Sequence, residues 1–375
     1  MELLGKSREE LREWMQALGE PAYRGDQIYR ALYQQRNFEI ARMTVLPAEL
    51  RERLAQEATI TLPAVRQRYL SKDGSVRYLF GLAAGEQKGA TKPASVEAVW
   101  MPSENRQTIC ISTQAGCAVD CQFCMTAQLG LIRNLTAGEI VGQILVALKE
   151  NEGSTDAESA ENIEISTEKS RDRKQTNVVL MGQGEPLLNF DSVMAAMRIV
   201  LDPKGIGLAP KHVTLSTSGI VPGIEKLAME PLRPKLAISL NASNDEQRNV
   251  LMPVNRKYPL KELLAACKKF PTGSREYITF EYVLLGGVND TPDDARRVAR
   301  LMSGLGRVKV NLIPWNPGSL PYKEPTAEAV AEFHRILLEK DVPAFTRYSR
   351  GRDVMAACGQ LALKEADSSQ LTVLS

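Results

Sequence analysis

Three cysteines within eight residues are the most chemically distinctive feature of this sequence. Cys117, Cys121 and Cys124 come directly after a strand-like run, so we expect their thiols to share one loop at the carboxyl end of that strand. Three thiolates can bind three irons of a [4Fe-4S] cluster and leave the fourth iron open. A structural zinc site is the alternative. Zinc needs four ligands, however, and besides three scattered cysteines the chain offers only His212 and His334.

The other three cysteines differ in their surroundings. Cys110 lies in the strand that leads to the three-cysteine loop, and as a buried strand cysteine it would by itself be interpreted as a core residue. Cys358 lies in a segment bounded by Gly351 and Gly359, which we expect to be flexible. Cys267 has helical spacing to its apolar neighbours, so we assign it to the core. Because no signal peptide is evident, we expect a cytoplasmic protein whose cysteines are metal ligands or reactive thiols.

Alternating strands and helices position these residues. The predicted strands are Thr108–Ser112, Asn177–Met181, His212–Ser216, Leu236–Leu240, Ile278–Leu284 and Lys309–Ile313. The predicted helices are Ala137–Lys149, Asp191–Leu201, Pro222–Met229, Leu260–Phe270, Pro292–Met302 and Ala327–Glu339. Such alternation is typical of an α/β fold with a parallel sheet and right-handed crossovers. Six units predict a partial (β/α)6 barrel, with its site at the carboxyl ends of the strands.

The chain divides into three predicted regions. Residues 1–95 contain three helical patterns and a hairpin, and we expect a small N-terminal accessory domain. Residues 96–345 form the barrel, and residues 346–375 form a C-terminal segment that carries Cys358. Within the barrel, residues 151–175 are charged, rich in serine and free of aromatic residues, which predicts a flexible surface insertion.

Bulk composition is that of an ordinary globular protein. The 375 residues are 43% hydrophobic and 25% charged, with a formal net charge of only +2. No apolar run approaches the roughly 20 residues of a membrane span. Composition therefore predicts no membrane partner, and a net charge this small does not by itself indicate nucleic acid.

Further motifs give a resemblance to a known family. The cysteine pattern, with Phe123 before its last cysteine, resembles the radical S-adenosylmethionine (SAM) superfamily. The segments GQGEPLLN, TLSTSG, ISLNASND, NLIPWNP and AACGQL are similar, in order and spacing, to the dual-specificity adenosine-C2 methyltransferases of 23S ribosomal RNA and transfer RNA. The likeness runs from about Leu3 to about Leu361. It implies a [4Fe-4S] cluster, SAM, both RNA substrates and an electron donor such as flavodoxin or ferredoxin, with no DNA partner.

The resemblance also implies roles for three catalytic residues. Cys358 matches the cysteine that accepts a methyl group and then binds the RNA base covalently. Cys110 matches the cysteine that attacks the Cys358 sulfur and releases the product, forming a transient disulfide. Glu97 matches the proposed acceptor of the proton at C2, although a carboxylate on a strand is usually only a surface residue.

Cofactor contacts follow from the same resemblance. Gly184 and Glu185 match the segment that binds the methionine amino group, and a glycine there lets the backbone approach a ligand closely. The other implied cofactor contacts are Ser216, Ser239, Leu240, Asn241 and Asn316. The family usually has histidine where this chain has Asn241, and asparagine keeps a hydrogen-bond donor and acceptor.

Residues near Cys358 also suit RNA, although a solvated basic loop is an equally good interpretation. The residues concerned are Lys309, Trp315, Arg347, Tyr348, Arg350 and Arg352. The main alternative function is an adenosine-C8 methyltransferase of the antibiotic-resistance type, which shares the two-cysteine scheme. A methylthiotransferase would need cysteines for a second cluster. A non-catalytic RNA-binding protein with a structural metal is the remaining alternative.

Overall fold

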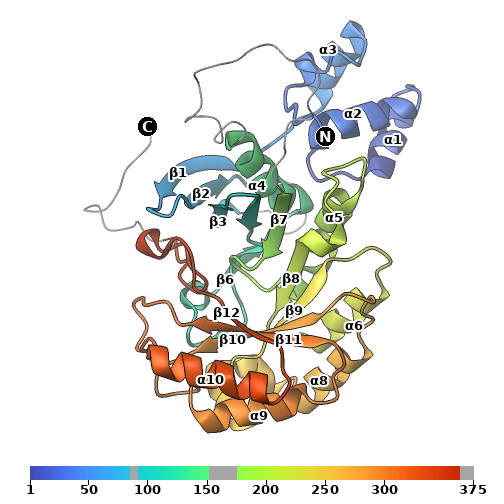
Figure 1. Ribbon diagram of the computed structural model, residues 1–375. Coiled ribbons are helices and arrows are strands. Elements are labelled where there is room, and N and C mark those ends of the chain that lie inside the picture. Colours follow the sequence, from blue (N-terminus) through green and yellow to red (C-terminus); the bar gives the residue numbers. More distant parts are fainter. Residues whose placement is uncertain (85–91, 152–174, 364–375) are drawn as a thin grey trace, which may run out of the picture.

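A single curved sheet organises the molecule (Figure 1). The computed structural model describes residues 1–84, 92–151 and 175–363. Within these residues ten strands pair in the order β1-β2-β3-β4-β7-β8-β9-β10-β11-β12. The interior of the predicted insertion lies outside the described residues.

The six predicted barrel strands are confirmed, all parallel. They are β4 (Arg106–Cys110), β7 (Gln175–Leu180), β8 (Val213–Thr217), β9 (Lys235–Ser239), β10 (Ile278–Leu284) and β11 (Val308–Pro314). A further short parallel strand, β12 (Ala344–Thr346), extends the edge beside β11. Because the strands run the same way, their carboxyl ends meet at one rim, as a site at that rim requires.

The predicted crossover helices are also present, and Figure 1 shows them along the outer face of the sheet. They are α4 (Ala137–Glu150), α5 (Phe190–Leu201), α6 (Val221–Met229), α8 (Leu260–Lys269), α9 (Pro292–Met302) and α10 (Ala327–Glu339). Thr136 and Thr291 start α4 and α9 with capping boxes, which explains those boundaries. The short α7 (Asp245–Leu251), capped by Asn244, was not predicted. None of the described helices is long and apolar enough to cross a membrane.

The N-terminal part consists of three helices and the start of the sheet. The helices are α1 (Arg8–Ala17), α2 (Tyr23–Tyr33) and α3 (Ala48–Glu57). The predicted hairpin is present as β1 (Ala64–Leu70) and β2 (Val76–Leu82), and β3 (Ala94–Pro102) pairs with both β2 and β4. The sheet therefore continues without a break past residue 95, where we predicted the end of the accessory domain.

The C-terminal segment crosses from β12 back to the β1–β2 turn (Figure 1). Arg350 donates to the backbone oxygen of Asp73 at 2.6 Å, and the Asp73 carboxylate accepts from the backbone N–H of Gly351 at 2.8 Å. Asp353 accepts from the Ser71 hydroxyl at 2.6 Å and from the Lys72 backbone N–H at 3.0 Å. These bonds fix the chain just before Cys358 against the other end of the sheet.

Short elements complete the described structure. The hairpin β5 (Gln114–Gly116) and β6 (Leu131–Asn134) forms a second, two-stranded sheet. The 3-10 helices are Ile40–Arg42, Met125–Leu129, Pro186–Asn189, Pro210–His212, Pro253–Arg256 and Arg352–Val354.

Candidate active site

The three-cysteine loop is fixed at its base by the β5–β6 hairpin. The Cys117 backbone N–H donates to the Gly130 carbonyl at 3.0 Å. Gly116 has a φ of +73°, and a Cβ there would collide with the same carbonyl, so glycine is required. The loop is further fixed where Trp315 donates its indole N–H to the Phe123 carbonyl at 3.3 Å.

Cys117, Cys121 and Cys124 line one cavity of about 170 Å³ at the carboxyl ends of the barrel strands. Burial, with repulsion from nearby acidic groups, raises the pKa of Cys117 to about 12. Among the described residues no group of three ligating side chains converges on a point where a single metal ion could bind. A cubane cluster does not need such convergence, because each thiolate binds a different iron. The three thiols in one cavity therefore fit an iron–sulfur cluster better than zinc.

Gly184 and Glu185 line the same cavity, as predicted for cofactor contacts. Gly184 has a φ of +98°, and a Cβ would lie only 2.5 Å from the Gln114 side chain. The Glu185 carboxylate accepts from the backbone N–H groups of Ser218 at 2.6 Å and Leu187 at 3.0 Å. Burial raises its pKa, whereas these hydrogen bonds lower it. The result is a fixed, buried carboxylate suited to an ammonium group.

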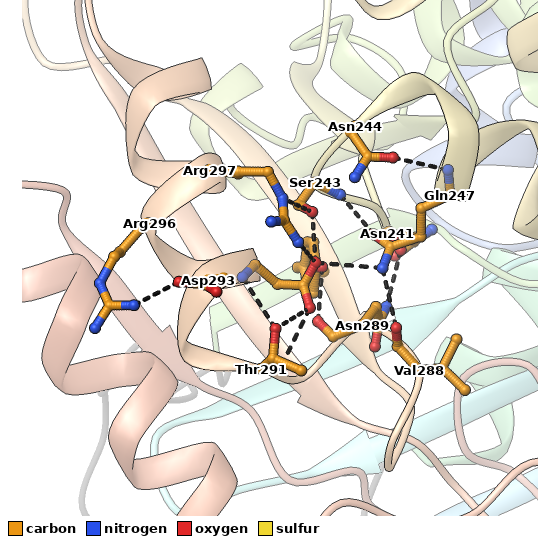
Figure 2. A network of polar contacts seen from close by, with 12 residues as sticks. Asn241, Ser243, Asn244, Gln247, Val288, Asn289, Thr291, Asp293, Arg296 and Arg297 are labelled. Atoms are coloured by element: carbon orange, nitrogen blue, oxygen red, sulfur yellow. Dashed lines mark hydrogen bonds and ion pairs between the residues drawn. The ribbon is translucent and has the colours of Figure 1, made fainter.

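Ser216, Ser239 and Asn241 also line this cavity, on neighbouring strands and the loop that follows them. The two serine hydroxyls are 3.5 Å apart. Asn241 has a φ of +55°. Its side-chain oxygen accepts from the Val283 backbone N–H at 2.9 Å, and its backbone carbonyl accepts from the Asn289 side-chain amide at 2.9 Å. Figure 2 shows this residue in a polar network that joins the loop after β9 to the start of α9.

Two predicted cofactor contacts lie elsewhere. Leu240 is fully buried in the hydrophobic core and does not line the cavity. Asn316 donates to the Ser349 hydroxyl at 2.9 Å and to the Cys358 carbonyl at 3.2 Å. Its described partners therefore belong to the C-terminal segment, which it helps to hold over the site.

The cluster loop and the C-terminal segment are bonded to each other. The Met125 backbone N–H donates to the Gly359 carbonyl at 2.8 Å, and the Thr126 hydroxyl donates to the Leu361 carbonyl at 2.7 Å. These bonds place Cys358 directly beside the loop of the three cysteines.

Cys358 and Cys110 line a second cavity of about 190 Å³. Cys358 also lines the first cavity, so the surface that its side chain exposes faces these two cavities. Enclosure by protein, with repulsion from Glu281, raises the pKa of Cys358 to about 11. Burial and the Cys358 charge also raise the pKa of Cys110. All six cysteines are free, so the predicted transient disulfide is not formed in this state. Cys267 is buried in the core, as predicted.

The structure does not bring Glu97 to either cavity. This carboxylate is 1% exposed and accepts from the Arg77 guanidinium at 2.5 Å. Its second oxygen accepts from the Leu363 backbone N–H at 3.0 Å and from the Gln183 amide at 3.3 Å. Burial raises the Glu97 pKa, and Arg77 opposes that shift. In this arrangement Glu97 holds the chain that follows Cys358.

Glu281 is a cavity residue that was not predicted from the sequence. This residue of β10 lines the first cavity with Cys358 and accepts from the Asn311 amide at 3.0 Å. Burial raises its pKa to about 7. The signal was available, because Glu281 is the single charged residue in the strand Ile278–Leu284, whose other residues are apolar or aromatic except Thr279. A charge within a strand buried on both faces indicates a polar cavity.

The residues expected to meet RNA separate into two groups. Arg350 is bonded to the β1–β2 turn, Arg352 forms an ion pair with Glu324 at 2.9 Å, and Trp315 is 5% exposed. Arg347 and Tyr348 are exposed and line the second cavity, which leaves them free to meet a substrate.

Comparison with known proteins places this fold and site in a class of enzymes. Residues 111–302 match the Radical SAM superfamily, and residues 1–60 match the ribosomal RNA large subunit methyltransferase N-terminal domain. A solved structure of a radical SAM methyltransferase from Sphaerobacter thermophilus superposes with a TM-score of 0.85 and is 40% identical. It covers 97% of this chain, and this chain covers all of it.

Full-length relatives identify the family. A probable dual-specificity RNA methyltransferase RlmN of Koribacter versatilis is 48% identical over 94% of this chain and 99% of its own length. The dual-specificity RNA methyltransferase RlmN of Geobacter sulfurreducens is 42% identical over 96% of this chain and 92% of its own. This chain belongs to the RlmN family of radical SAM methyltransferases. It is therefore an enzyme of the class that uses a [4Fe-4S] cluster and SAM, as the sequence motifs predicted.

Proposed function

We propose that this enzyme methylates C2 of adenosine in 23S ribosomal RNA and transfer RNA, with Cys358 carrying the methyl carbon and Cys110 releasing the product. The observation that supports this most directly is the shared position of Cys358. It lines both the cavity of the cluster thiols and the cavity of Cys110. A sulfur between a cofactor site and a second thiol can receive a group from one side and be attacked from the other.

The chain's own residues account for cofactor binding. Cys117, Cys121 and Cys124 would hold the cluster, and Gly184 with Glu185 would hold the amino group of SAM. When bound, these groups supply a transferable methyl group and a 5′-deoxyadenosyl radical. Further contacts would come from Ser216, Ser239 and Asn241, whereas Leu240 and Asn316 would act through their neighbours.

Cys358 and Cys110 would act in successive steps. The Cys358 thiol loses its proton and accepts the methyl group. One hydrogen atom of that methyl group goes to the 5′-deoxyadenosyl radical, and the carbon then bonds to C2, so that RNA becomes linked to the enzyme; the adduct loses the C2 proton and one electron, which the cluster would take up. The Cys110 thiolate attacks the Cys358 sulfur and breaks its bond to the carbon, which takes up a proton, so that the methylated base leaves and a disulfide remains between the two residues. The role of Glu97 as acceptor of the C2 proton stays a prediction, and it would require Glu97 to leave its ion pair with Arg77.

The partners follow from the same proposal. The relatives described above carry the dual-specificity RNA methyltransferase name, which favours this assignment over C8 methylation and over a non-catalytic RNA-binding protein. A low-potential electron donor such as flavodoxin or ferredoxin would supply the electron that the radical chemistry consumes. Six free cysteines suit the reducing cytoplasm.

One experiment tests the proposal. The protein is purified without oxygen, its iron is counted, and it is incubated with SAM, a reductant and unmodified transfer RNA or a 23S ribosomal RNA fragment. We expect 5′-deoxyadenosine, and 2-methyladenosine after digestion of the RNA. Finding 8-methyladenosine instead would overturn the C2 assignment, and finding no methylated nucleoside would overturn the RNA assignment.

A further inference from the structure

Three cations on neighbouring strands form no ion pair with a carboxylate among the described residues, and one of them, Arg347, lines the second cavity. Lys235 begins β9, Lys309 lies near the start of β11, and Arg347 follows β12. The ion pairs among the described residues involve none of them. By contrast, Arg350 and Arg352 in the neighbouring segment both have carboxylate partners.

Two of the three cations, Lys309 and Arg347, lie beside one aromatic ring. The Phe345 ring is 44% exposed, and it lies 6.0 Å from the Lys309 ammonium and 5.4 Å from the Arg347 guanidinium. Lys309 and Ala237 both pair with Thr279 of β10, so Lys235 lies at the amino end of the same strands, and the Lys309 charge acts on it. Tyr348, which follows Arg347 in the chain, is 69% exposed. We call Lys235, Lys309, Phe345, Arg347 and Tyr348 the basic row.

The cations of the basic row repel one another in the enzyme without RNA. Burial, and then the charge of Lys309, lowers the pKa of Lys235, while burial and then Arg347 lower the pKa of Lys309. The acids that act on these groups are Glu276 and Glu281. Glu276 accepts from the Gly273 backbone N–H at 3.0 Å and Glu281 from Asn311. Like charges that stay close without a counter-charge are stabilised when an anion binds between them.

The row leads into the cavity of the two reactive cysteines. Arg347 and Tyr348 line that cavity together with Cys110 and Cys358. Exposed aromatic rings beside cations are what single-stranded nucleic acid requires, because bases stack on the rings while phosphates meet the cations. An acidic protein partner would also bind the cations, but it would not require exposed aromatic rings beside them.

We propose that the basic row binds the sugar-phosphate backbone of the unpaired nucleotides that flank the target adenosine, and so guides that base into the cavity of Cys110 and Cys358. This inference rests on the proposed RNA substrate. Lys235, Lys309 and Arg347 contact phosphates, and Phe345 and Tyr348 offer stacking faces to the neighbouring bases.

The test measures binding without catalysis. The iron-loaded full chain is titrated with unmodified transfer RNA in the absence of reductant, at a series of salt concentrations. The variant Lys235→Gln/Lys309→Gln/Arg347→Gln is compared with the control Lys261→Gln/Lys268→Gln/Lys269→Gln. The control removes the same charge from exposed positions on α8. Thermal midpoints and iron content confirm that each variant folds. If the triple variant does not fold, the single variants Lys309→Gln and Arg347→Gln replace it in the RNA titration.

We expect the slope of log affinity against log salt to become shallower by about 2 in the triple variant, because each single-strand phosphate contact contributes about 0.7. If variant and wild type bind RNA equally at 1 M salt, this difference in slope makes the variant bind on the order of a hundredfold more weakly than the wild type at 0.1 M salt. The control should bind like the wild type.

Three outcomes would overturn the inference. The triple variant could keep the wild-type slope. The control could lose as much affinity as the triple variant, which would mean that net charge alone matters. The triple variant could keep RNA affinity but lose reduction by flavodoxin, which would make the row a site for an acidic protein. If the wild type itself binds no RNA, the proposed function fails instead.

Discussion

The two reactive cysteines make different contributions, and their variants should fail in different ways. Cys358→Ala removes the thiol that accepts the methyl group, so no methyl should reach protein or RNA. Cys110→Ala leaves the earlier steps possible but removes the sulfur that resolves the adduct. We expect Cys110→Ala to accumulate RNA bound to Cys358, seen as a slowly migrating, nuclease-sensitive band. Normal turnover by Cys110→Ala would make Cys110 a core residue, and an adduct at Cys267 would overturn both roles.

Glu281 gives a prediction about pH. Burial raises its pKa to about 7 from the usual 4.5, so the folded enzyme binds the proton more tightly than the unfolded chain does. Stability contributed by this group is therefore lost as pH rises from about 4.5 to about 7. We expect Glu281→Gln to be more stable than wild type at pH 8, by at most about 3 kcal/mol, and not at pH 4.5. Thermal midpoints at both pH values measure this, and equal destabilisation at both would contradict it.

The surroundings of a residue were predictable where its partners are close to it in the sequence. The cysteine spacing places three thiols in one loop, and the structure puts them in one cavity. The surroundings of Glu97 were not predictable, because its partners Arg77, Gln183 and Leu363 come from three distant segments. Only the fold brings those segments together, and the same applies to Arg350, whose partner Asp73 is in the β1–β2 turn.

Among the elements, the three-cysteine loop allows a direct test. Replacing Cys121 by Ala should abolish the brown iron chromophore and all 5′-deoxyadenosine, because two thiolates cannot retain a cubane with an open iron. The same loss is expected for Cys117→Ala and Cys124→Ala, whereas Cys267→Ala should keep its iron because Cys267 is packed in the core. Iron analysis of anaerobic protein checks this, and a full cluster in any of the three variants would refute the ligand assignment.

The C-terminal segment should open when its contact with the β1–β2 turn is weakened. Asp353→Ala removes hydrogen bonds to Ser71 and Lys72, which costs about 1 kcal/mol. We expect iodoacetamide to alkylate Cys358 about five times faster in this variant than in the wild type. Mass spectrometry of the peptide that contains Cys358 measures the rate, and the iron content should be unchanged. Asp293→Ala, at an exposed position of α9, is the control and should react at the wild-type rate. Equal rates in both variants would show that this contact does not hold the segment.

Element prediction succeeded for long periodic segments and failed for short ones. All six barrel strands and their helices were predicted to within a few residues, because each buries a regular apolar pattern. The strands β5, β6 and β12 have three or four residues each, too few to establish a period. Their pairing depends on tertiary neighbours, as in the hydrogen bonds from the Thr113 and Gln114 backbone N–H groups to the Gln183 carbonyl.

For the whole molecule, one continuous core predicts one unfolding transition. The buried apolar residues of α1 to α3 belong to the same cluster as those of the barrel, from Leu3 to Ala344. In single-tryptophan variants that keep only Trp14, in α1, or only Trp315, at the cavity, the fluorescence midpoint of each variant should therefore equal the midpoint of the same variant by far-UV circular dichroism. A Trp14 fluorescence midpoint separate from the circular dichroism midpoint of that variant would show that the N-terminal helices unfold independently.

The closure of the site by the C-terminal segment also has a consequence for biosynthesis. The ribosome makes Cys117 to Cys124 long before Gly359 and Leu361, which cover that loop in the folded enzyme. At usual elongation rates the interval is on the order of tens of seconds. During that time the nascent chain presents the three thiols without their cover, so the iron–sulfur delivery machinery has an open route to them. Once Gly359 and Leu361 have been made, the hydrogen bonds that cover the loop can form.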